Sequence, residues 1–465
     1  MNKCYLTISI AMAALGGLTA SAERGPNDSP GEKQELPADA SGDSEKVSET
    51  YSSDSERGES SPASAVGEAS STEAADGIKV TYPVDILAWN APDEFPEHGE
   101  PNFVFSSRNK RFYLGVGGMV KGSASFDWGD PTGNDYAFLT SEIPVERRPG
   151  DGAKWMFSAK TSYLYLNFVA FSDSPNRVGA YINFNFTGDG YCPALQYAYL
   201  RWRDFTVGYS YTLFTDQQAS APTIDYQGPN SFTGVQMALI NYEHKFGKGK
   251  RWQVGVGLNM PMTSVTDGND AVSVSQRLPD IPAYIQYGSS DGSAHLRLTG
   301  ILRNLYYRDE VRRSNVDKIG WGVKLSGMTP IVGALSCFGQ AVYGHGITSY
   351  YQDLTDCGLD MVYSPVKGSL TPLKSWGGYF GLQYDFTDRL HLSGAYSHIR
   401  LYPGDGELPE GDSTYKYAQY AVGTLTYDIT DWLSAGVEYI YGRRVQPDGT
   451  QRHDSRVMTA LSVNF

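Results

Sequence analysis

Apolar and polar residues alternate along most of the chain after about residue 110. In the last segment Val457, Leu461 and Phe465 share one face, and Arg456 and Met458 occupy the other. Because successive side chains of a β-strand point to opposite faces, this pattern predicts strands with one apolar and one polar surface. Segments of about ten such residues are typical of transmembrane β-strands, which face lipid on one side and a lumen on the other.

Sixteen such segments follow one another up to the C-terminus. Their approximate centres are residues 117, 163, 182, 198, 209, 239, 256, 285, 298, 323, 338, 381, 395, 423, 437 and 460. Short turns are expected at 172–176, 203–204, 247–250, 289–292, 329–330, 387–388 and 430–431, and long loops at 129–153, 215–233, 262–280, 304–317, 344–375 and 402–415. The connection at 188–192 is the exception, because it is short although it lies at the end of the barrel where the other connections are long. Alternating short turns and long loops predict an all-β fold, namely a transmembrane up-and-down antiparallel β-barrel of about 16 strands over residues 110–465.

A soluble β-sandwich or propeller is the alternative fold, since its strands also alternate. The strand lengths favour a membrane barrel, and so do the aromatic residues expected at strand ends, including Tyr163, Tyr165, Trp202 and Trp432. The chain also ends on Phe465, directly after the last amphipathic segment. Such an ending is typical of outer-membrane proteins that the barrel-assembly machinery recognises.

The first 109 residues differ from the barrel region. Residues 1–22 have the three parts of a secretory signal peptide: a basic start, an apolar core and a small-residue cleavage site. Residues 23–77 hold 14 acidic and 4 basic residues and little apolar surface, which predicts a disordered acidic linker. Residues 78–109 are expected to be a periplasmic lead-in segment. Export together with a barrel predicts the outer membrane of a Gram-negative cell, after removal of the signal peptide.

Composition adds a few exclusions. The 465 residues carry a formal net charge of −14, with 33 Tyr and 51 Gly. An acidic chain with no basic block is a poor candidate for binding nucleic acid. The seven His residues have no metal-ligand spacing and no motif indicates a catalytic group, so we expect no metal, no cofactor and no enzymatic activity. Cys337 and Cys357 could pair across one loop, which their spacing alone does not decide.

Four segments resemble the DcaP-like outer-membrane porins. They read VGAYINFNF at 178–186, QYAYLRW at 196–202, VGYSYTLF at 207–214 and APTIDYQGPN at 221–230. The resemblance implies a sixteen-stranded homotrimeric porin in outer-membrane lipid that passes small anionic solutes, notably dicarboxylates. The chain departs from the family at Tyr197, where the family has a His, and at 194–196, where the family has arginines.

A barrel of this size has a wide lumen that something must narrow. Loop 215–233 is the third connection on the side of the long loops, counting the short one at 188–192, and in sixteen-stranded porins this connection commonly folds inward. We expect it to form a polar constriction that includes Asp216, Gln217, Asp225 and Asn230. An ordinary surface loop is the alternative interpretation.

Cations that face the lumen are the second group of candidates. Alternation with lipid-facing leucines and Trp202 is expected to turn a set of basic side chains inward: Arg201, Arg203, His295, Arg297 and Arg303, with Lys160 as a further candidate. Arginine can bind a carboxylate with two parallel hydrogen bonds, so this set is predicted to bind anionic substrates. The alternative is that these groups only form salt bridges in a polar lumen.

The sequence thus predicts an outer-membrane porin for passive diffusion of small hydrophilic solutes, with a preference for small organic anions such as dicarboxylates. The second hypothesis is a barrel that acts as a surface structural or adhesion protein through its long loops. An outer-membrane enzyme is the third, and no motif supports it.

Overall fold

The structure is a computed structural model that describes residues 83–92, 101, 103–146, 150, 152–263, 265, 271–364, 366–404 and 415–465. The predicted signal peptide and acidic linker lie outside the described residues. In the part of the chain that is described, no helix has the length and apolar character needed to cross a membrane.

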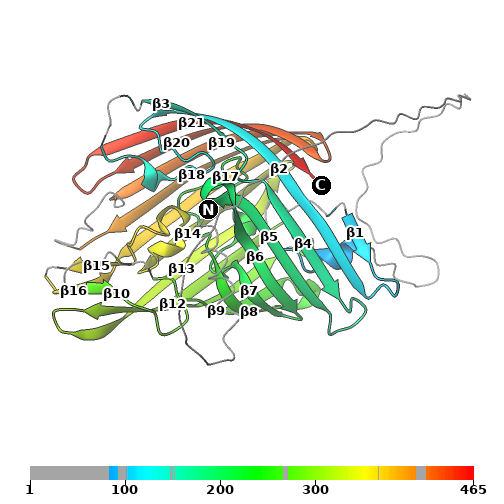
Figure 1. Ribbon diagram of the computed structural model, residues 1–465, viewed down its shortest axis with the longest axis horizontal. Helices are drawn as coiled ribbons and strands as arrows, with labels where there is room; N and C mark the ends of the chain where they lie inside the picture. Colours follow the sequence, from blue (N-terminus) through cyan, green and yellow to red (C-terminus); the bar gives the residue numbers. More distant parts are fainter. Residues whose placement is uncertain are drawn as a thin grey trace, which may run out of the picture. The chain divides into compact units, whose positions relative to one another are not determined.

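Sixteen wall strands form a closed antiparallel barrel (Figure 1). They are β2 (Phe112–Gly129), β4 (Tyr163–Ala170), β5 (Val178–Gly188), β6 (Cys192–Trp202), β7 (Phe205–Tyr211), β8 (Gln236–Phe246), β9 (Trp252–Asn259), β11 (Ile281–Gly288), β12 (His295–Asp309), β13 (Ser314–Val332), β14 (Leu335–His345), β17 (Lys374–Thr387), β18 (Leu390–Tyr402), β19 (Tyr417–Thr430), β20 (Leu433–Val445) and β21 (Gln451–Asn464). Each strand pairs with the next, and β21 pairs with β2 from Asn464 opposite Met119 to Asp454 opposite Gly129. This last pairing closes the sheet, so the fold predicted from the alternating pattern is confirmed.

Shorter elements complete the wall and its ends. Strands β3 (Ala153–Ser158) and β10 (Ala271–Ser273) extend β4 and β11, since they pair with further residues of β2 and β12. Strand β1 (Phe103–Ser106) pairs with β2 beyond the point where β21 ends, and β15 (Met361–Ser364) forms a separate hairpin with β16 (Ser369–Pro372). The helices are α2 (Pro83–Ala88) and the single turns η1 (Thr140–Glu142), η2 (Asp189–Tyr191), η3 (Gln217–Ala219), η4 (Lys248–Lys250), η5 (Thr348–Tyr350) and η6 (Gln352–Leu354).

All sixteen expected strand centres fall within strands, but two expected connections are wrong. The turn expected at 329–330 lies at 333–334, because β13 continues to Val332, which pairs with Leu335. The long loop expected at 304–317 is a four-residue turn, because β12 and β13 pair as far as Asp309 and Ser314. The charged residues of this stretch are compatible with strands, because a strand pair can carry them where it extends past the apolar band of the wall.

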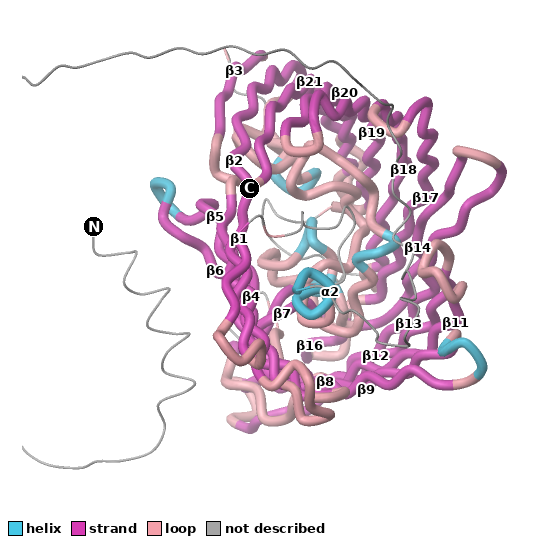
Figure 2. The backbone as a smooth tube through the Cα atoms, turned by 90° about the vertical axis from the view of Figure 1, so that its right-hand side faces the viewer, coloured by secondary structure: helices cyan, strands magenta, loops and turns pink. Residues whose placement is uncertain are grey.

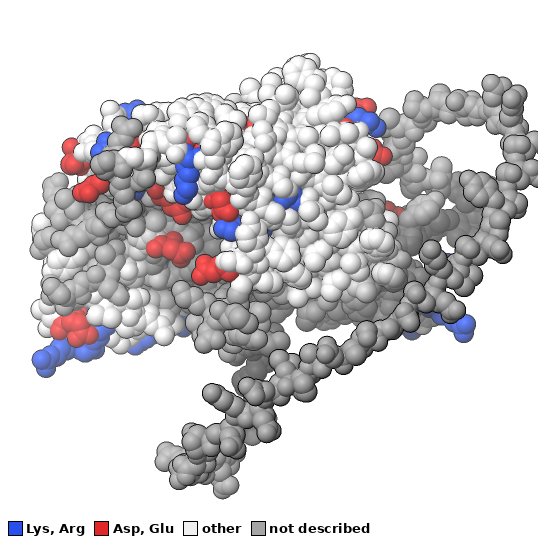
Figure 3. All heavy atoms as spheres, turned by 45° about the horizontal axis from the view of Figure 1, so that its top comes forward, with Lys and Arg blue, Asp and Glu red and all other residues white. Residues whose placement is uncertain are grey.

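The outer surface of the barrel is apolar. Val457 and Leu461 of β21 are exposed, whereas Arg456 and Met458 of the same strand are buried toward the lumen. On the face shown in Figure 3 the wall is largely uncharged, and acidic and basic side chains gather toward its two ends. The expected aromatic belt is confirmed only in part: Trp202 and Trp432 are exposed, but Tyr165 is buried on the lumen side.

Three connecting segments fill much of the interior: 130–152 between β2 and β3, 212–235 between β7 and β8, and 346–373 between β14 and β17 (Figure 2). Segment 346–373 provides Tyr350 and Leu354 to an apolar cluster that also contains Phe214 of 212–235 and the wall residue Ile399. A second cluster joins Phe138, Phe232 and wall residues of β17, β19 and β20. These loops therefore have their own apolar core inside the barrel.

The segment that precedes β2 also lies against the inner wall. Asn90 is buried, its side-chain amide donates to Asn167 Oδ1 at 2.9 Å, and its carbonyl accepts from Tyr199 at 2.6 Å. The carbonyl of Trp89 accepts from Arg201, and Gly179 leaves the space that the Asn90 side chain occupies. Part of the expected lead-in segment 78–109 thus lines the lumen around Trp89 and Asn90, whereas β1 pairs with the edge of β2.

A methyl group at position 179 should disturb this docking. In Gly179→Ala the new Cβ overlaps the Asn90 side chain, so we expect the free energy of unfolding to fall by about 1–3 kcal/mol, as overpacking does elsewhere. Urea unfolding of the folded barrel measures the change. Gly423→Ala is the matched control, because nothing lies within 4 Å of its added Cβ. Equal stabilities of the two variants would contradict the close fit of Asn90 against Gly179.

Candidate functional site

Loop 212–235 crosses the lumen from β7 to the opposite wall. Near its start Lys324 of β13 donates to the carbonyl of Phe214, and Ser326 donates to Asp216 at 2.6 Å. Further along, Tyr379 of β17 donates to the carbonyl of Ala219 at 2.7 Å. These wall strands face β7 across the barrel, so the loop lies inside the lumen and not on the surface.

Asp216 is the first buried anchor of this loop. Its carboxylate lies 2.9 Å from His295 Nε2, and Arg297 donates to the neighbouring carbonyl of Thr215 at 3.2 Å. Burial acts to raise the pKa of Asp216, but Arg297, His295 and Lys324 outweigh it and hold the pKa well below the ordinary value. Asp216 is therefore a carboxylate close to the basic side chains of Arg297, His295 and Lys324.

The second anchor joins the loop to β20 and β2. Glu438 of β20 accepts from the backbone N–H groups of Ile224 and Asp225 at 2.6 and 2.9 Å, and Lys121 of β2 donates to the carbonyl of Ile224 at 2.7 Å. Asp225 itself accepts from the backbone N–H of Phe138 at 2.8 Å, which ties the loop to segment 130–152. Burial, and then the nearby Glu438 carboxylate, raise the pKa of Asp225 to about 7.

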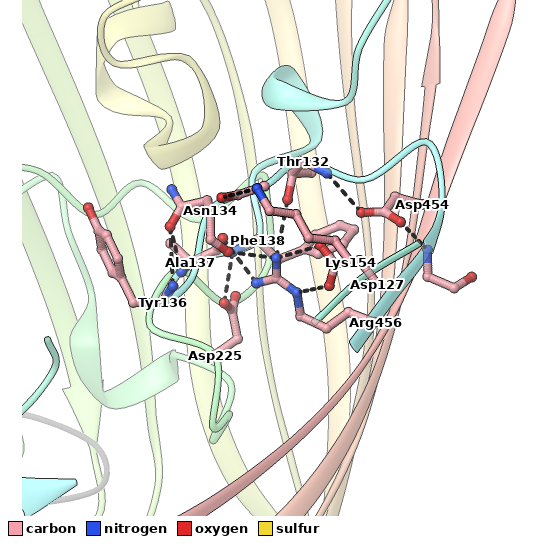
Figure 4. Close-up of polar contacts among 12 residues, drawn as sticks. Asp127, Thr132, Asn134, Tyr136, Ala137, Phe138, Lys154, Asp225, Asp454 and Arg456 are labelled. Atoms are coloured by element: carbon pink, nitrogen blue, oxygen red, sulfur yellow. Dashed lines mark hydrogen bonds and ion pairs between the residues drawn. The ribbon is translucent and has the colours of Figure 1, made fainter. Parts of the chain in front are cut away.

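Segment 130–152 is held by a buried ion pair (Figure 4). Arg456 of β21 donates to both oxygens of Asp127 on β2, at 2.6 and 2.8 Å, and both side chains are fully buried. The same guanidinium donates to the carbonyl of Asn134 at 2.7 Å. Asp454 accepts from the backbone N–H of Thr132 at 3.1 Å. Two adjacent wall strands thus fix one end of this segment.

A cavity of about 680 Å³ remains beside loop 212–235. One side is the wall of β2 and β4 to β7, and another is formed by lumen-facing residues of β17 to β21. Its lining includes Lys121, Tyr163, Asn183, Asn185, Gln196, Tyr197, Tyr211, Gln217, Asp225, Tyr226, Gln236, Gln383, His391 and Asp428. Its volume falls in the range of about 300–1,000 Å³ that is usual for small-molecule sites.

A smaller cavity of about 80 Å³ adjoins the same loop. Arg201 and Arg297 line it together with the carboxylates of Asp216 and Glu243. Gln217 and Tyr211 line both cavities, and Gln217 donates to Tyr197 at 3.2 Å. Gln217, near the start of the loop, thus lies between the two spaces.

The structure brings only some of the predicted site residues together. Asp216, Gln217, His295, Arg201 and Arg297 lie around the first anchor and the smaller cavity. Asp225 and Asn230 are buried at the other end of the loop, where Asn230 accepts from Ser397 at 2.7 Å.

The remaining three cations lie elsewhere. Arg303 is buried and pairs with Asp280 at 2.9 Å and Asp360 at 3.1 Å. Lys160 pairs with Asp135 at 2.7 Å, in the break between β3 and β4. Arg203 is an exposed residue of the turn after β6, where it donates to Asn176 at 2.7 Å, so the structure does not place it in the lumen.

Other lumen residues were not identified from the sequence. Lys121, Lys324 and Glu438 anchor loop 212–235, and Arg456 anchors segment 130–152. Their strands alternate as expected, so the inward direction was available from the sequence. The sequence did not show which of the inward residues would contact a loop, because that contact depends on where the loop crosses the lumen. Cys337 and Cys357 are both free thiols, so the structure does not pair them.

Comparisons with known proteins agree with this architecture. A family model described as a porin subfamily matches residues 161–460. The chain belongs to this porin family. No curated protein sequence matches it.

The solved structures add the fold. The outer membrane channel DcaP of Acinetobacter baumannii matches with a TM-score of 0.66 and 21% identity, over 78% of this chain and 99% of that one. OmpF of Salmonella typhi matches with a TM-score of 0.49 and 12% identity, over 78% and 100% of the two chains, and OmpT of Vibrio cholerae with 0.49 and 10%, over 78% and 99%. The resemblance to DcaP-like porins is confirmed, and the porin is placed in the Gram-negative outer membrane. Family and fold are those of a channel.

The Asp127–Arg456 pair should contribute strongly to the stability of this porin, because it holds segment 130–152 against the wall. Asp127→Asn leaves a buried guanidinium without its counter-charge, and we expect a loss of about 3 kcal/mol in the free energy of unfolding. Urea unfolding measures it. Asp431→Asn is the control, because the Asp431 side chain is 97% exposed and lies 3.7 Å from Arg389. A control loss as large as that of Asp127→Asn would show that the buried pair has no special weight.

Asp225 should make stability depend on pH. Its folded pKa of about 7 lies above the ordinary value of 3.8, so the folded state binds more protons than the unfolded state between these values. Its contribution to stability is therefore full below about pH 4 and is lost as pH rises through about 7. Asp225→Asn removes this titration, so its unfolding free energy should fall less between pH 5 and 8 than that of the unaltered protein. Parallel curves for the two proteins would refute the role of Asp225.

Proposed function

We propose that this protein is a passive diffusion channel for small hydrophilic solutes. The observation that carries the proposal is the cavity of about 680 Å³ beside loop 212–235, which many hydrogen-bonding side chains line, inside a closed barrel of the porin family. Loops 130–152 and 346–373 occupy much of the remaining lumen, so solutes pass along the wall of β2 and β4 to β7. Loop 212–235 acts as the constriction on this path.

The finer proposal is a preference for small organic anions such as dicarboxylates. It is supported by the resemblance and by Arg201 and Arg297, which both line the smaller cavity. Arg303 and Lys160 contribute less in this proposal, because each is already paired with a carboxylate. The preference therefore depends on two arginines and not on a ladder of them.

The assembly of the porin is also part of the proposal. The resemblance supports a homotrimer in outer-membrane lipid, exported by the signal peptide 1–22 and inserted by the barrel-assembly machinery through Phe465. The backbone of Phe465 pairs with Gly118 at 2.8 and 2.9 Å, so the C-terminal residue is part of the seam that closes the barrel. The acidic segment 23–77 serves as a linker on the periplasmic side.

Conductance of the purified full-length protein in planar bilayers tests both the proposed channel and its proposed preference for anions. We expect stepwise openings of the channel. In a salt gradient, the reversal potential should have the sign that indicates a preference for anions. Arg201→Gln combined with Arg297→Gln should lower the anion-to-cation permeability ratio about two- to threefold, because the smaller cavity then keeps Asp216 and Glu243 without their cations. Arg389→Gln, in the turn after β17, is the control.

The outcomes separate these two proposals. Openings with cation preference would leave the channel and remove the preference for anions. Folded, heat-modifiable protein without openings would contradict the channel and favour a surface structural or adhesion role.

A further inference from the structure

The larger cavity is lined mainly by uncharged hydrogen-bonding side chains. Its amides come from wall strands on several sides and include Asn183 and Asn185 of β5, Gln196 of β6, Gln236 of β8 and Gln383 of β17. Hydroxyl groups of Thr161 and of several serines complete the lining. Such a surface offers hydrogen bonds without a field of one sign.

Several of these amides have atoms that no protein group satisfies. Asn183 is only 2% exposed, and its Oδ1 has no hydrogen-bond partner among the described residues. The same holds for Oε1 of Gln383 and for Nε2 of Gln227 and Gln236. Buried polar atoms are costly unless something binds them, so water or a solute is expected to do so. Asn185 and Gln196 already form hydrogen bonds with Tyr226, so the unsatisfied amide atoms are those of Asn183, Gln227, Gln236 and Gln383.

The charged groups that line the cavity are already engaged by protein partners. Lys121 donates to the carbonyl of Ile224, and His391 lies 2.7 Å from Asp385 and 3.5 Å from Asp428. Asp428 also accepts from Ser434 at 2.6 Å. A carboxylate solute would therefore meet basic groups that are already engaged, together with the carboxylate of Asp428. A hydroxyl group, which donates and accepts, matches the amides without that repulsion.

Tyrosines add apolar faces to this polar surface. Tyr163, Tyr197 and Tyr211 come from β4, β6 and β7, and the ring centroids of Tyr197 and Tyr211 are 5.8 Å apart. Tyr226 of loop 212–235 faces them, is 38% exposed, and donates to Gln196 at 2.6 Å. A tyrosine ring offers a flat apolar face together with a hydroxyl group, which suits a ring that has C–H groups on its face and hydroxyls on its edge.

We propose that this cavity binds an uncharged polyhydroxylated solute of the size of a mono- or disaccharide. The amides bind hydroxyl groups and the tyrosine rings cover the C–H face of the sugar. The proposal rests on the proposed function, because the solute reaches the cavity only through a conducting lumen. The two cavities then have different roles. The larger cavity selects solutes by hydrogen bonding, and the arginines of the smaller cavity select them by charge.

Sucrose block of single-channel current tests the proposal on the purified full-length protein in a planar bilayer. We expect sucrose to reduce the current along a saturating curve. Asn183→Leu and Gln236→Met keep the approximate side-chain shape and remove the amide, so each should raise the half-saturating concentration at least fivefold. The two positions lie on different strands, so a folding defect in one variant leaves the other as a test. Asn315→Leu is the control, because Asn315 is exposed at the start of β13 and does not line the cavity.

Three results would overturn the proposal. One is a linear, viscosity-like decrease of current in sucrose that is the same in all variants while channels open normally. Another is a saturating block by succinate, with none by sucrose, that Asn183→Leu weakens, since the site would then bind anions. Absence of any openings from folded protein would instead refute the channel itself and this inference with it, so the two failures are distinguishable.

Discussion

The constraint on which the rest of the structure depends is that no backbone hydrogen-bonding group can remain unpaired in lipid. The chain meets it by pairing β21 with β2, a seam that includes the terminal residue, because Phe465 and Gly118 exchange backbone hydrogen bonds. The remaining edge of β2 lies beyond the end of β21 and is covered by β1. Closure with sixteen strands then fixes a lumen too wide for wall side chains to fill.

The loops that fill this lumen need polar anchors as well as an apolar core. Loop 212–235 is fastened through Asp216 at one end and Glu438 at the other. Asp353 of segment 346–373 accepts from Thr140 at 2.6 and 2.7 Å and from Tyr415 at 2.9 Å, so it joins three connections at one carboxylate. Burial raises the pKa of Asp353. The lumen contains many charged residues, but most of those named here are used as anchors between loops and wall, so few of them are left for a solute.

The sequence predicted the wall far better than the interior. Period-two alternation is a local property, so Leu296, Leu298 and Leu302 correctly placed His295, Arg297 and Arg303 on the lumen side. What each cation meets there depends on a loop distant in sequence. Arg303 is buried against Asp280 and Asp360, and no local pattern indicates that pairing. Tyr165 illustrates the same limit, since its residue type suggested a lipid interface and its strand register turns it inward.

The two halves of the lumen consequently differ in how their side chains are packed. On the side of β12 to β19, segment 346–373 packs against the wall in a dry cluster around Tyr350, Tyr351 and Leu354, which have no exposed surface. On the side of β2 and β4 to β7 the wall strands are largely free of this cluster, and tyrosines and amides are the most frequent side chains where they line the larger cavity. Lys121, Lys324 and His295 are engaged by the anchors of loop 212–235, so the loop leaves these basic side chains less available to a solute. In the proposed channel, selectivity would therefore depend on which polar groups the loops leave unpaired more than on how many charges the lumen contains.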